Sequence, residues 1–353
     1  MNAETNLPMP GASVFAENTT LGTSTDADGN FKLYLPPGGY EVIATFTGFN
    51  SSRKRIATTD NLPLNFELKV HEKQMMDIAV VSSSEVKDGW IKYGDFFIAE
   101  FIGKTENSNN CTIKNKEAIH FYFSKRRNRL KVTSDEPLLI ENKSLGYNIR
   151  YNLDSFTHEY NTNISWFTGS PLFEEIPLAD STDITQLQQR ADARKKAYDG
   201  SILHFMRSVY NKKLKENGFE IQFIVKDNGN DRALKLKNFY GALNYNFYDS
   251  TQTVEIKPNQ TDLGVIYIKE KPSPDFLASR DNEPSAFQFS VLSFLPGETL
   301  VIEKNGYYYE QTDVTISAYW TWEKVADLLP YNYMLTEENI PVQNLSQESS
   351  SAN

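Results

Sequence analysis

The chain has 353 residues and a formal net charge of −10, with 46 acidic and 36 basic residues. At this length two or more domains are expected, and a hydrophobic content of 39% is enough for a packed core. The acidic balance argues against a nucleic-acid partner, which needs a basic face. The single cysteine, Cys111, excludes an intrachain disulfide and any Cys-x-x-Cys motif.

Neither a membrane-spanning segment nor a signal peptide is visible in the sequence. No run of 18 apolar residues occurs, so we expect no transmembrane helix. The polar start, Met1–Thr5, leads us to expect an exported protein from which a signal peptide has been removed. The polar C-terminal end predicts a disordered tail over residues 336–353.

The first 70 residues show short strand patterns separated by turns about ten residues apart. Asp28-Gly29 supplies the positive φ that a tight hairpin needs. The strands are expected at residues 12–16, 31–35, 40–46 and 64–68. In the second of them, Phe31, Leu33 and Leu35 alternate with Lys32 and Tyr34, which is the period of a half-buried strand. This pattern predicts a small all-β sandwich over residues 1–70.

The order of these signals resembles a known family. The strings are Leu7–Val14, Gly22–Phe31, Leu35–Tyr40 and Phe46–Phe49. They are similar to the carboxypeptidase-regulatory-like domain, a prealbumin-like sandwich common in envelope proteins of Bacteroidota. The resemblance implies a location in the periplasm or at the outer membrane. The family usually has one more strand before this start, which leaves one sheet edge of the sandwich in question.

The remaining chain predicts a second, larger domain of the α+β class with antiparallel sheet. Residues 71–85, with the strand-like Met75–Val81, are expected to be a linker or connecting strand, followed by a domain over 86–335. Apolar residues at helical spacing predict four helices, at about 89–103, 183–198, 202–214 and 322–329. Strands are expected at 138–140, 147–153, 156–166, 219–225, 253–256, 264–268, 287–294 and 300–303.

Several strings of this second part carry a further resemblance. They are Phe101–Asn107, Cys111–Asn115, Glu136–Tyr147, Arg194–Ser208 and Tyr319–Pro330. They look like the long C-terminal region of the carboxypeptidase-like regulatory domain-containing envelope proteins, over residues 86–333. That group has no assigned activity, so the resemblance implies architecture and location.

The motifs of common enzyme classes are missing. A zinc carboxypeptidase needs His-x-x-Glu, but the residues three positions after the four histidines are Gln74, Phe123, Asn161 and Arg207. No Gly-x-Ser-x-Gly and no nucleotide-binding glycine loop occurs. Asp26 and Asp28 do not continue into a calcium-loop pattern. We therefore predict no catalytic, metal-binding or cofactor-binding residues and no cofactor.

One basic run and two side-chain groups remain as candidates. Lys125–Arg129 is typical of a solvated hairpin turn, and its alternative is a patch for an anionic ligand or lipid headgroup. Tyr198, His204, Arg207 and Tyr210 form a candidate group, with the spacing of His204, Arg207 and Ser208 on one helical side, either as an anion pocket or as structural ties. The aromatic residues Tyr307–Tyr309, Tyr319, Trp320 and Trp322 either stack on sugars or form core. The ligand-binding candidates are His204, Arg207, Tyr308, Trp320 and Trp322.

Three functions remain open. The first is a non-catalytic structural or interaction protein of the cell envelope, with the sandwich as a spacer or docking module for an envelope protein or glycan. The second is a glycan- or peptide-binding protein that uses the aromatic cluster near 307–322. The third is an unrecognised hydrolase, which would need two converging carboxylates in a pocket or a serine beside His204.

Overall fold

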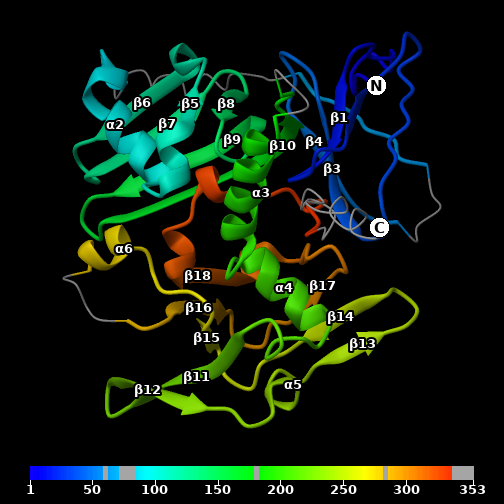
Figure 1. Cartoon of the computed structure of the whole chain (residues 1–353). Helices are drawn as coiled ribbons and strands as arrows, with labels where there is room; N and C mark the ends of the chain where they lie inside the picture. Colours follow the sequence, from blue (N-terminus) through cyan, green and yellow to red (C-terminus); the bar gives the residue numbers. More distant parts are fainter. Residues whose placement is uncertain (59–62, 71–84, 179–182, 281–284, 336–353) are drawn as a thin grey trace, which may run out of the picture.

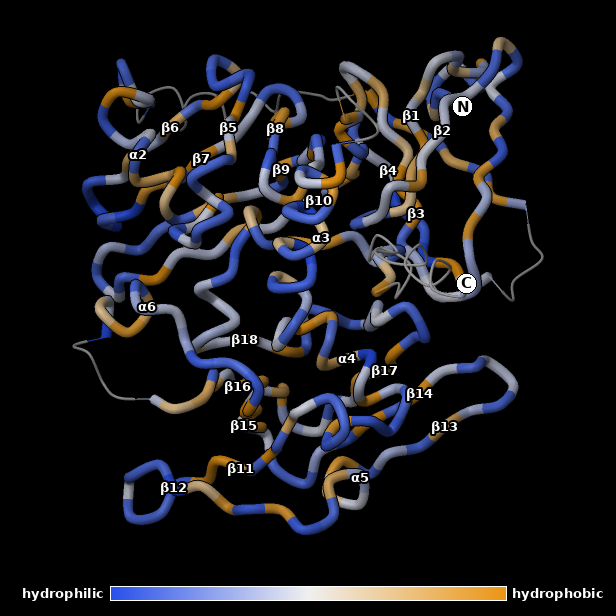
Figure 2. The backbone as a smooth tube through the Cα atoms, viewed as in Figure 1, coloured by the Kyte–Doolittle hydropathy of each residue, from blue (hydrophilic) through white to orange (hydrophobic). Residues whose placement is uncertain are grey.

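Four antiparallel sheets and five helices make up the described parts of the chain, which are residues 1–58, 63–70, 85–178, 183–280 and 285–335 of the computed structural model (Figure 1). The architecture is a small N-terminal sandwich module followed by an α+β region, as predicted. Figure 2 shows apolar residues along the strands and polar residues at outer turns such as the tip of the β11–β12 hairpin.

The N-terminal module is built on a four-stranded sheet in the order β2-β1-β3-β4. The strands are β1 (Ser13–Ala16), β2 (Gly22–Ser24), β3 (Gly39–Thr45) and β4 (Ser52–Ala57). The predicted turn at Asp26 is confirmed, because the Asp26 side chain accepts hydrogen bonds from the backbone N–H groups of Asp28 and Asn30.

Two predicted strands of the module do not join a sheet. Residues 31–35 have no strand hydrogen bonds to any described residue, and residues 64–68 make one isolated bridge at Leu68. The predicted alternation holds, since Phe31, Leu33 and Leu35 pack on the module's core while Lys32 and Tyr34 are exposed. Sequence period therefore identified the buried face of this segment, but pairing also needs a neighbouring strand within hydrogen-bond reach.

A six-stranded sheet forms the second layer, with the order β5-β8-β9-β7-β6 and β10 paired to β9. Its strands are β5 (Cys111–Ile113), β6 (Ile119–Ser124), β7 (Arg129–Ser134), β8 (Leu138–Asn142), β9 (Tyr147–Glu159) and β10 (Ile164–Glu175). Helix α2 (Gly89–Phe101) packs on this sheet through Phe97 and Phe101. Lys125–Asn128 form the turn of the β6–β7 hairpin, as predicted for the basic run.

A five-stranded sheet in the order β12-β11-β15-β16-β18 and a three-stranded sheet β13-β14-β17 enclose a separate core. Their strands are β11 (Phe219–Asp227), β12 (Asn230–Lys235), β13 (Asn246–Tyr248), β14 (Thr253–Ile256), β15 (Asp262–Tyr267), β16 (Gln288–Phe294), β17 (Leu300–Ile302) and β18 (Val314–Ala318). Helix α4 (Ile202–Tyr210) lies against this core and contributes Phe205, Met206 and Val209.

The helix predictions hold in part. Helix α3 (Ile184–Tyr198) begins after Asp183, whose side chain accepts a hydrogen bond from the Gln186 N–H at the predicted capping spacing. Helix α4 is shorter than predicted, because Lys212 has a positive φ of 54°. The sequence pattern missed two short helices, α5 (Phe239–Ala242) and α6 (Pro274–Ala278).

The predicted helix at 322–329 was wrong. This segment holds one single turn of 3-10 helix, η5 (Val325–Asp327), and another, η4 (Tyr319–Thr321), lies just before it. Ala318 has a φ of 62° and Lys324 is extended, so the backbone departs from helical geometry before η4 and again inside the segment. The apolar spacing that suggested a helix instead places Val325, Ala326 and Leu329 in the core of the second layer.

The β1–β2 loop of the module packs against β10 and the segment Leu329–Tyr331. Its Asn18 N–H donates to the Pro171 carbonyl on β10, and the Phe173 N–H donates to the Thr19 carbonyl, at 2.7 and 2.8 Å. On the other side, the Tyr331 N–H donates to the Asn18 carbonyl at 2.7 Å. Thr19 is fully buried. Because buried backbone groups are costly to leave unpaired, these bonds fix the module on the larger region.

Polar contacts from β4 and the start of β3 extend this interface. Arg53 pairs with Asp154 at 2.5 Å, and Arg55 pairs with Glu310 at 2.6 Å. The Asn305 side chain donates to the Gly39 carbonyl at 3.1 Å. Exposed ion pairs contribute little free energy, so they set the orientation of the module more than its stability.

Glu17 lies at the same junction and is poorly solvated. Burial raises the pKa of its carboxyl to about 7, against the lowering effect of Arg53, whose guanidinium is 3.6 Å away. An acid with a raised pKa in the folded state destabilises that state when it ionises.

The predicted linker falls almost entirely outside the described residues, which omit 71–84, and the predicted tail at 336–353 is also outside them. Within the described residues, no helix is long and apolar enough to cross a membrane.

The core of the second layer gives a first testable prediction. Phe97 has no exposed surface, and its ring packs on Phe101, Phe121 and Phe156. Phe97→Ala should lower the free energy of unfolding by about 3 to 5 kcal/mol, measured by urea denaturation. Ile91→Ala, on the same helix but at an 85% exposed position, is the control and should change it by less than about 0.5 kcal/mol. Equal losses in the two variants would contradict the packing described.

The Glu17 environment gives a second prediction. Its carboxyl binds a proton more tightly in the folded protein than in the unfolded chain, so its contribution to stability falls as pH rises from about 4.5 to about 7. Glu17→Gln removes this loss of stability. Between pH 4.5 and 7, the free energy of unfolding of the variant should rise relative to that of the wild type by up to about 3 kcal/mol. Denaturation of both proteins between pH 4.5 and 7.5 measures the difference. Parallel pH profiles would show that Glu17 is solvated.

Candidate functional site

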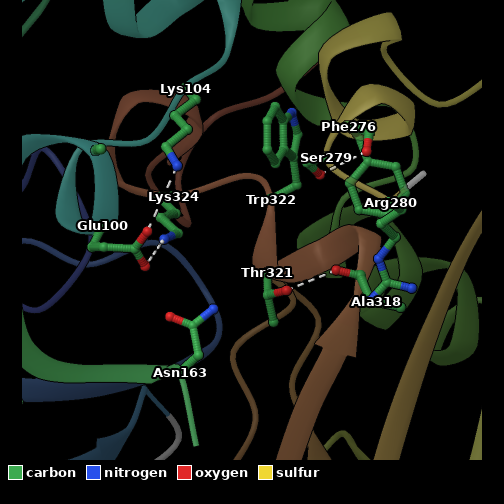
Figure 3. A pocket seen from close by; sticks show the side chains of 11 residues that line it. Glu100, Lys104, Asn163, Phe276, Ser279, Arg280, Ala318, Thr321, Trp322 and Lys324 are labelled. Carbon is green, nitrogen blue, oxygen red and sulfur yellow. Dashed lines mark hydrogen bonds and ion pairs between the residues drawn. The ribbon is translucent and has the colours of Figure 1, made fainter. Parts of the chain in front are cut away.

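A polar cleft of about 300 Å³ lies between the second layer and the five-stranded sheet (Figure 3). Helix α2 and the following turn supply Glu100 and Lys104 on one side. Helix α6 and its end supply Phe276 and Arg280 on the other. The cleft is completed by Ala99, Asn163, Ser279, Ala318, Thr321, Trp322 and Lys324. Two separate cores therefore build this one surface.

The cleft has a positive charge balance in an acidic protein. Lys104, Lys324 and Arg280 line it together with one carboxylate, Glu100. Burial raises the pKa of the Glu100 carboxyl, but Lys324 and the other nearby donors lower it more, and the net direction is down. Glu100 pairs with Lys324 at 3.0 Å and with Lys104 at 3.8 Å. Arg280 lines the cleft without an ion pair to any described residue.

Aromatic side chains form the second wall of the cleft. The rings of Trp322 and Phe276 meet edge to face with centroids 5.8 Å apart, and the Arg280 guanidinium lies 5.3 Å from the Phe276 ring (Figure 3). The Trp322 Nε1–H is buried and meets no acceptor among the described residues. Rings beside cations and polar side chains are the elements of sites that bind carbohydrates or peptides with acidic groups.

The structure brings His204 and Arg207 together with Tyr198 of α3, but the fourth predicted residue, Tyr210, donates instead to the Gln252 carbonyl. The His204 ring accepts the Gly200 N–H at its Nδ1 and stacks on Tyr198, with centroids 4.6 Å apart. Burial lowers the pKa of His204 to about 4. Arg207 donates to the carbonyl groups of Asn305 and Tyr331. Both side chains hold segments of the fold together.

The predicted aromatic cluster divides between core and cavity. Trp320 is only 4% exposed, and its Nε1–H donates to the Gly200 carbonyl at 2.8 Å. Tyr307 and Tyr319 are also buried. Tyr308 is half-buried and, with Trp320, lines a second cavity next to the cleft. Among the predicted ligand-binding residues, only Trp322 lines the cleft of Figure 3.

The serines beside His204 do not form a nucleophile and base pair. Ser201 Oγ accepts the backbone N–H of His204, and Ser208 Oγ donates to the His204 carbonyl. Neither contact involves the imidazole ring, which a serine nucleophile would need as its base.

Two carboxylates, Glu323 and Asp327, line the second cavity. Both oxygens of Asp327 accept hydrogen bonds from Thr105 Oγ1, and one also accepts from Asn107 Nδ2. Two carboxylates in one cavity are what the hydrolase alternative requires, and one of them is held by donors, so that alternative stays a prediction.

Sequence reasoning missed Lys104, Arg280 and Glu323. Each stands alone in its segment, without a motif or charge run around it. They become neighbours of the other lining residues only because the second layer and the five-stranded sheet meet at the segment 318–327.

Residues 1–81 match the family model of the CarboxypepD_reg-like domain. This match confirms the N-terminal module as a carboxypeptidase-regulatory-like sandwich and extends it beyond residue 70. The matched segment covers less than a quarter of the 353 residues. No curated protein and no solved structure matches the chain.

The buried environment of His204 gives a third prediction. An imidazole that is desolvated by Tyr198, Phe219 and Tyr267 should stay neutral as pH falls through 6, and should gain a proton only near pH 4. The NMR chemical shifts of its ring protons measure this titration. A midpoint between 6 and 7 would instead fit a solvated histidine able to act as a general base.

Proposed function

We propose that this protein is a non-catalytic interaction protein of the cell envelope, in which the N-terminal sandwich is a docking module. The support for docking is the β1–β2 loop, whose backbone bonds to β10 and to the segment at Tyr331. A sandwich that served only as a flexible spacer would not need buried backbone bonds to two other segments of the chain.

The envelope location is supported by the family of the module. Carboxypeptidase-regulatory-like sandwiches resemble those of exported Bacteroidota proteins, and we propose a periplasmic or outer-membrane-associated place for this chain as well. The regulatory-like module is accessory to catalysis in carboxypeptidases, which agrees with an interaction role.

The ligand that the cleft supports best is a glycan with acidic groups. The observation that favours it is the combination of Trp322, Arg280 and Lys104 on one surface of about 300 Å³. Of the aromatic residues that were predicted to stack on sugars, this proposal therefore keeps Trp322, and it adds Phe276. A carboxylate on the sugar would pair with the Arg280 guanidinium, while the sugar ring packs on the aromatic wall of the cleft.

A binding and turnover experiment tests this function and gives a fourth prediction. Digalacturonate and its methyl ester differ in charge but share their ring faces. We expect the wild type to bind the acid at least about tenfold more tightly than the ester in calorimetry, and to leave it uncleaved by mass spectrometry. Arg280→Ala should lower affinity for the acid by about tenfold and change affinity for the ester little.

A matched control removes an equal charge elsewhere. Arg127→Ala, at the exposed β6–β7 turn, should leave the affinity for digalacturonate unchanged. Equal losses of affinity for digalacturonate in both variants would place the anion contact outside the cleft. Release of monosaccharide would show that the protein is an enzyme.

A further inference from the structure

A second cavity, of about 210 Å³, lies where the module and both cores of the larger region meet. Asn18 reaches it from the module's β1–β2 loop. The side facing α4 is mostly apolar. The other lining residues are Ala197, Ser201, Ile202, Leu203, Gly306, Tyr308, Ile316, Trp320, Glu323, Lys324, Asp327, Leu328, Leu329 and Tyr331. This cavity is separate from the cleft of Figure 3, with which it shares only Lys324.

Three charged residues line the cavity, and two of them are already engaged. Lys324 Nζ bonds Glu100 in the cleft at 3.0 Å, as Figure 3 shows. Asp327 is held by Thr105 and Asn107. The Glu323 carboxyl forms no hydrogen bond and no ion pair with any residue that the structure describes. Glu323 is thus the group of this cavity that lacks a counter-charge.

The Glu323 side chain is half-buried, and a carboxylate without a partner in a mostly apolar cavity carries a desolvation cost. Burial raises the pKa of Glu323 well above its usual value, and the negative charges of Asp327 and Glu270 raise it further. Of the three charged residues that line the cavity, two are acidic and the third, Lys324, is paired with Glu100. A positively charged group beside the Glu323 carboxylate would offset this desolvation cost, because it would pair with the ionised carboxyl.

The walls of the cavity also suit a cation. Trp320, Tyr308 and Tyr331 present aromatic rings, whose faces attract ammonium groups. The Asn18 Oδ1 atom is a buried acceptor without a partner among the described residues. Lys324 is turned toward Glu100 and away from this role. The groups that remain in the cavity are acceptors, aromatic rings and one carboxylate, and all of them favour a positively charged ligand.

We propose that this cavity binds a small organic ammonium ion, with Glu323 as its counter-ion and Trp320, Tyr308 and Tyr331 as its aromatic walls. This inference goes beyond the interaction function, because it concerns a different cavity and a ligand of opposite charge. Binding pairs the ionised Glu323, so a proton leaves its carboxyl as the cation enters. Affinity for the cation therefore rises with pH, and the ligand stabilises the contact between the module and the larger region.

Choline and its neutral isostere 3,3-dimethylbutan-1-ol test the proposal on the full chain. The wild type should bind choline at least tenfold more tightly than the isostere, with a melting temperature that rises in choline. Calorimetry at one pH in two buffers of different ionisation enthalpy should show proton release on binding. Equal binding of the two probes, or no binding of choline, would overturn the proposal.

Two variants locate the site. Glu323→Gln keeps the shape of the side chain and should lower the affinity for choline at least tenfold, while its affinity for the isostere stays the same. Glu106→Gln removes the same charge at an 82% exposed side chain and should bind choline like the wild type. If Glu323→Gln does not fold, Tyr308→Leu serves instead and should lower choline affinity by at least threefold. Wild-type affinity for choline in either folded variant would refute the assignment of the site.

Discussion

The packing of the β1–β2 loop against β10 and the segment at Tyr331 is the contact on which the arrangement of the module and the larger region depends. Asn18 uses its N–H on one neighbour and its carbonyl on the other, and Thr19 beside it is fully buried. A single turn therefore bonds to β10 of the second layer and to the segment at Tyr331. The second cavity lies at this joint, since Asn18 and Tyr331 both line it.

This joint changes how the N-terminal module is understood. Sequence similarity identifies a regulatory-like sandwich over residues 1–81, and the sequence pattern predicts a separate unit followed by a linker. The structure gives that unit a contact surface of backbone hydrogen bonds, ion pairs from β4 and the poorly solvated Glu17. The module and the larger region are then parts of one packed body.

Local sequence patterns predicted what local physics controls. The capping spacing at Asp183 and Gln186, the Asp28-Gly29 turn and the β14 strand at 253–256 all follow from neighbouring residues. The strand at 31–35 and the helix at 322–329 were wrong for a different reason. Strand pairing and the backbone path of the segment 322–329 depend on partners far away in sequence, which no window of ten residues contains.

The same limit applies to the candidate sites. Trp320 and Trp322 are two residues apart, yet one is a core side chain bonded to Gly200 and the other lines the cleft. Composition could suggest an aromatic site in this segment, but only the packing of two cores decides which ring is accessible. Arg280 and Glu323 carry no motif, and their importance follows from what surrounds them in space: a ring for one, and an apolar cavity without a counter-charge for the other.

Native-state hydrogen exchange of three amides, those of Asn18, Phe173 and Tyr331, tests the central claim most directly. If the loop joins the layers into one body, these amides should open with a free energy within about 1 kcal/mol of core amides such as those of Leu130 and Leu292. Exchange of the three amides at the rate of unprotected loops, while Leu130 and Leu292 stay protected, would contradict the account.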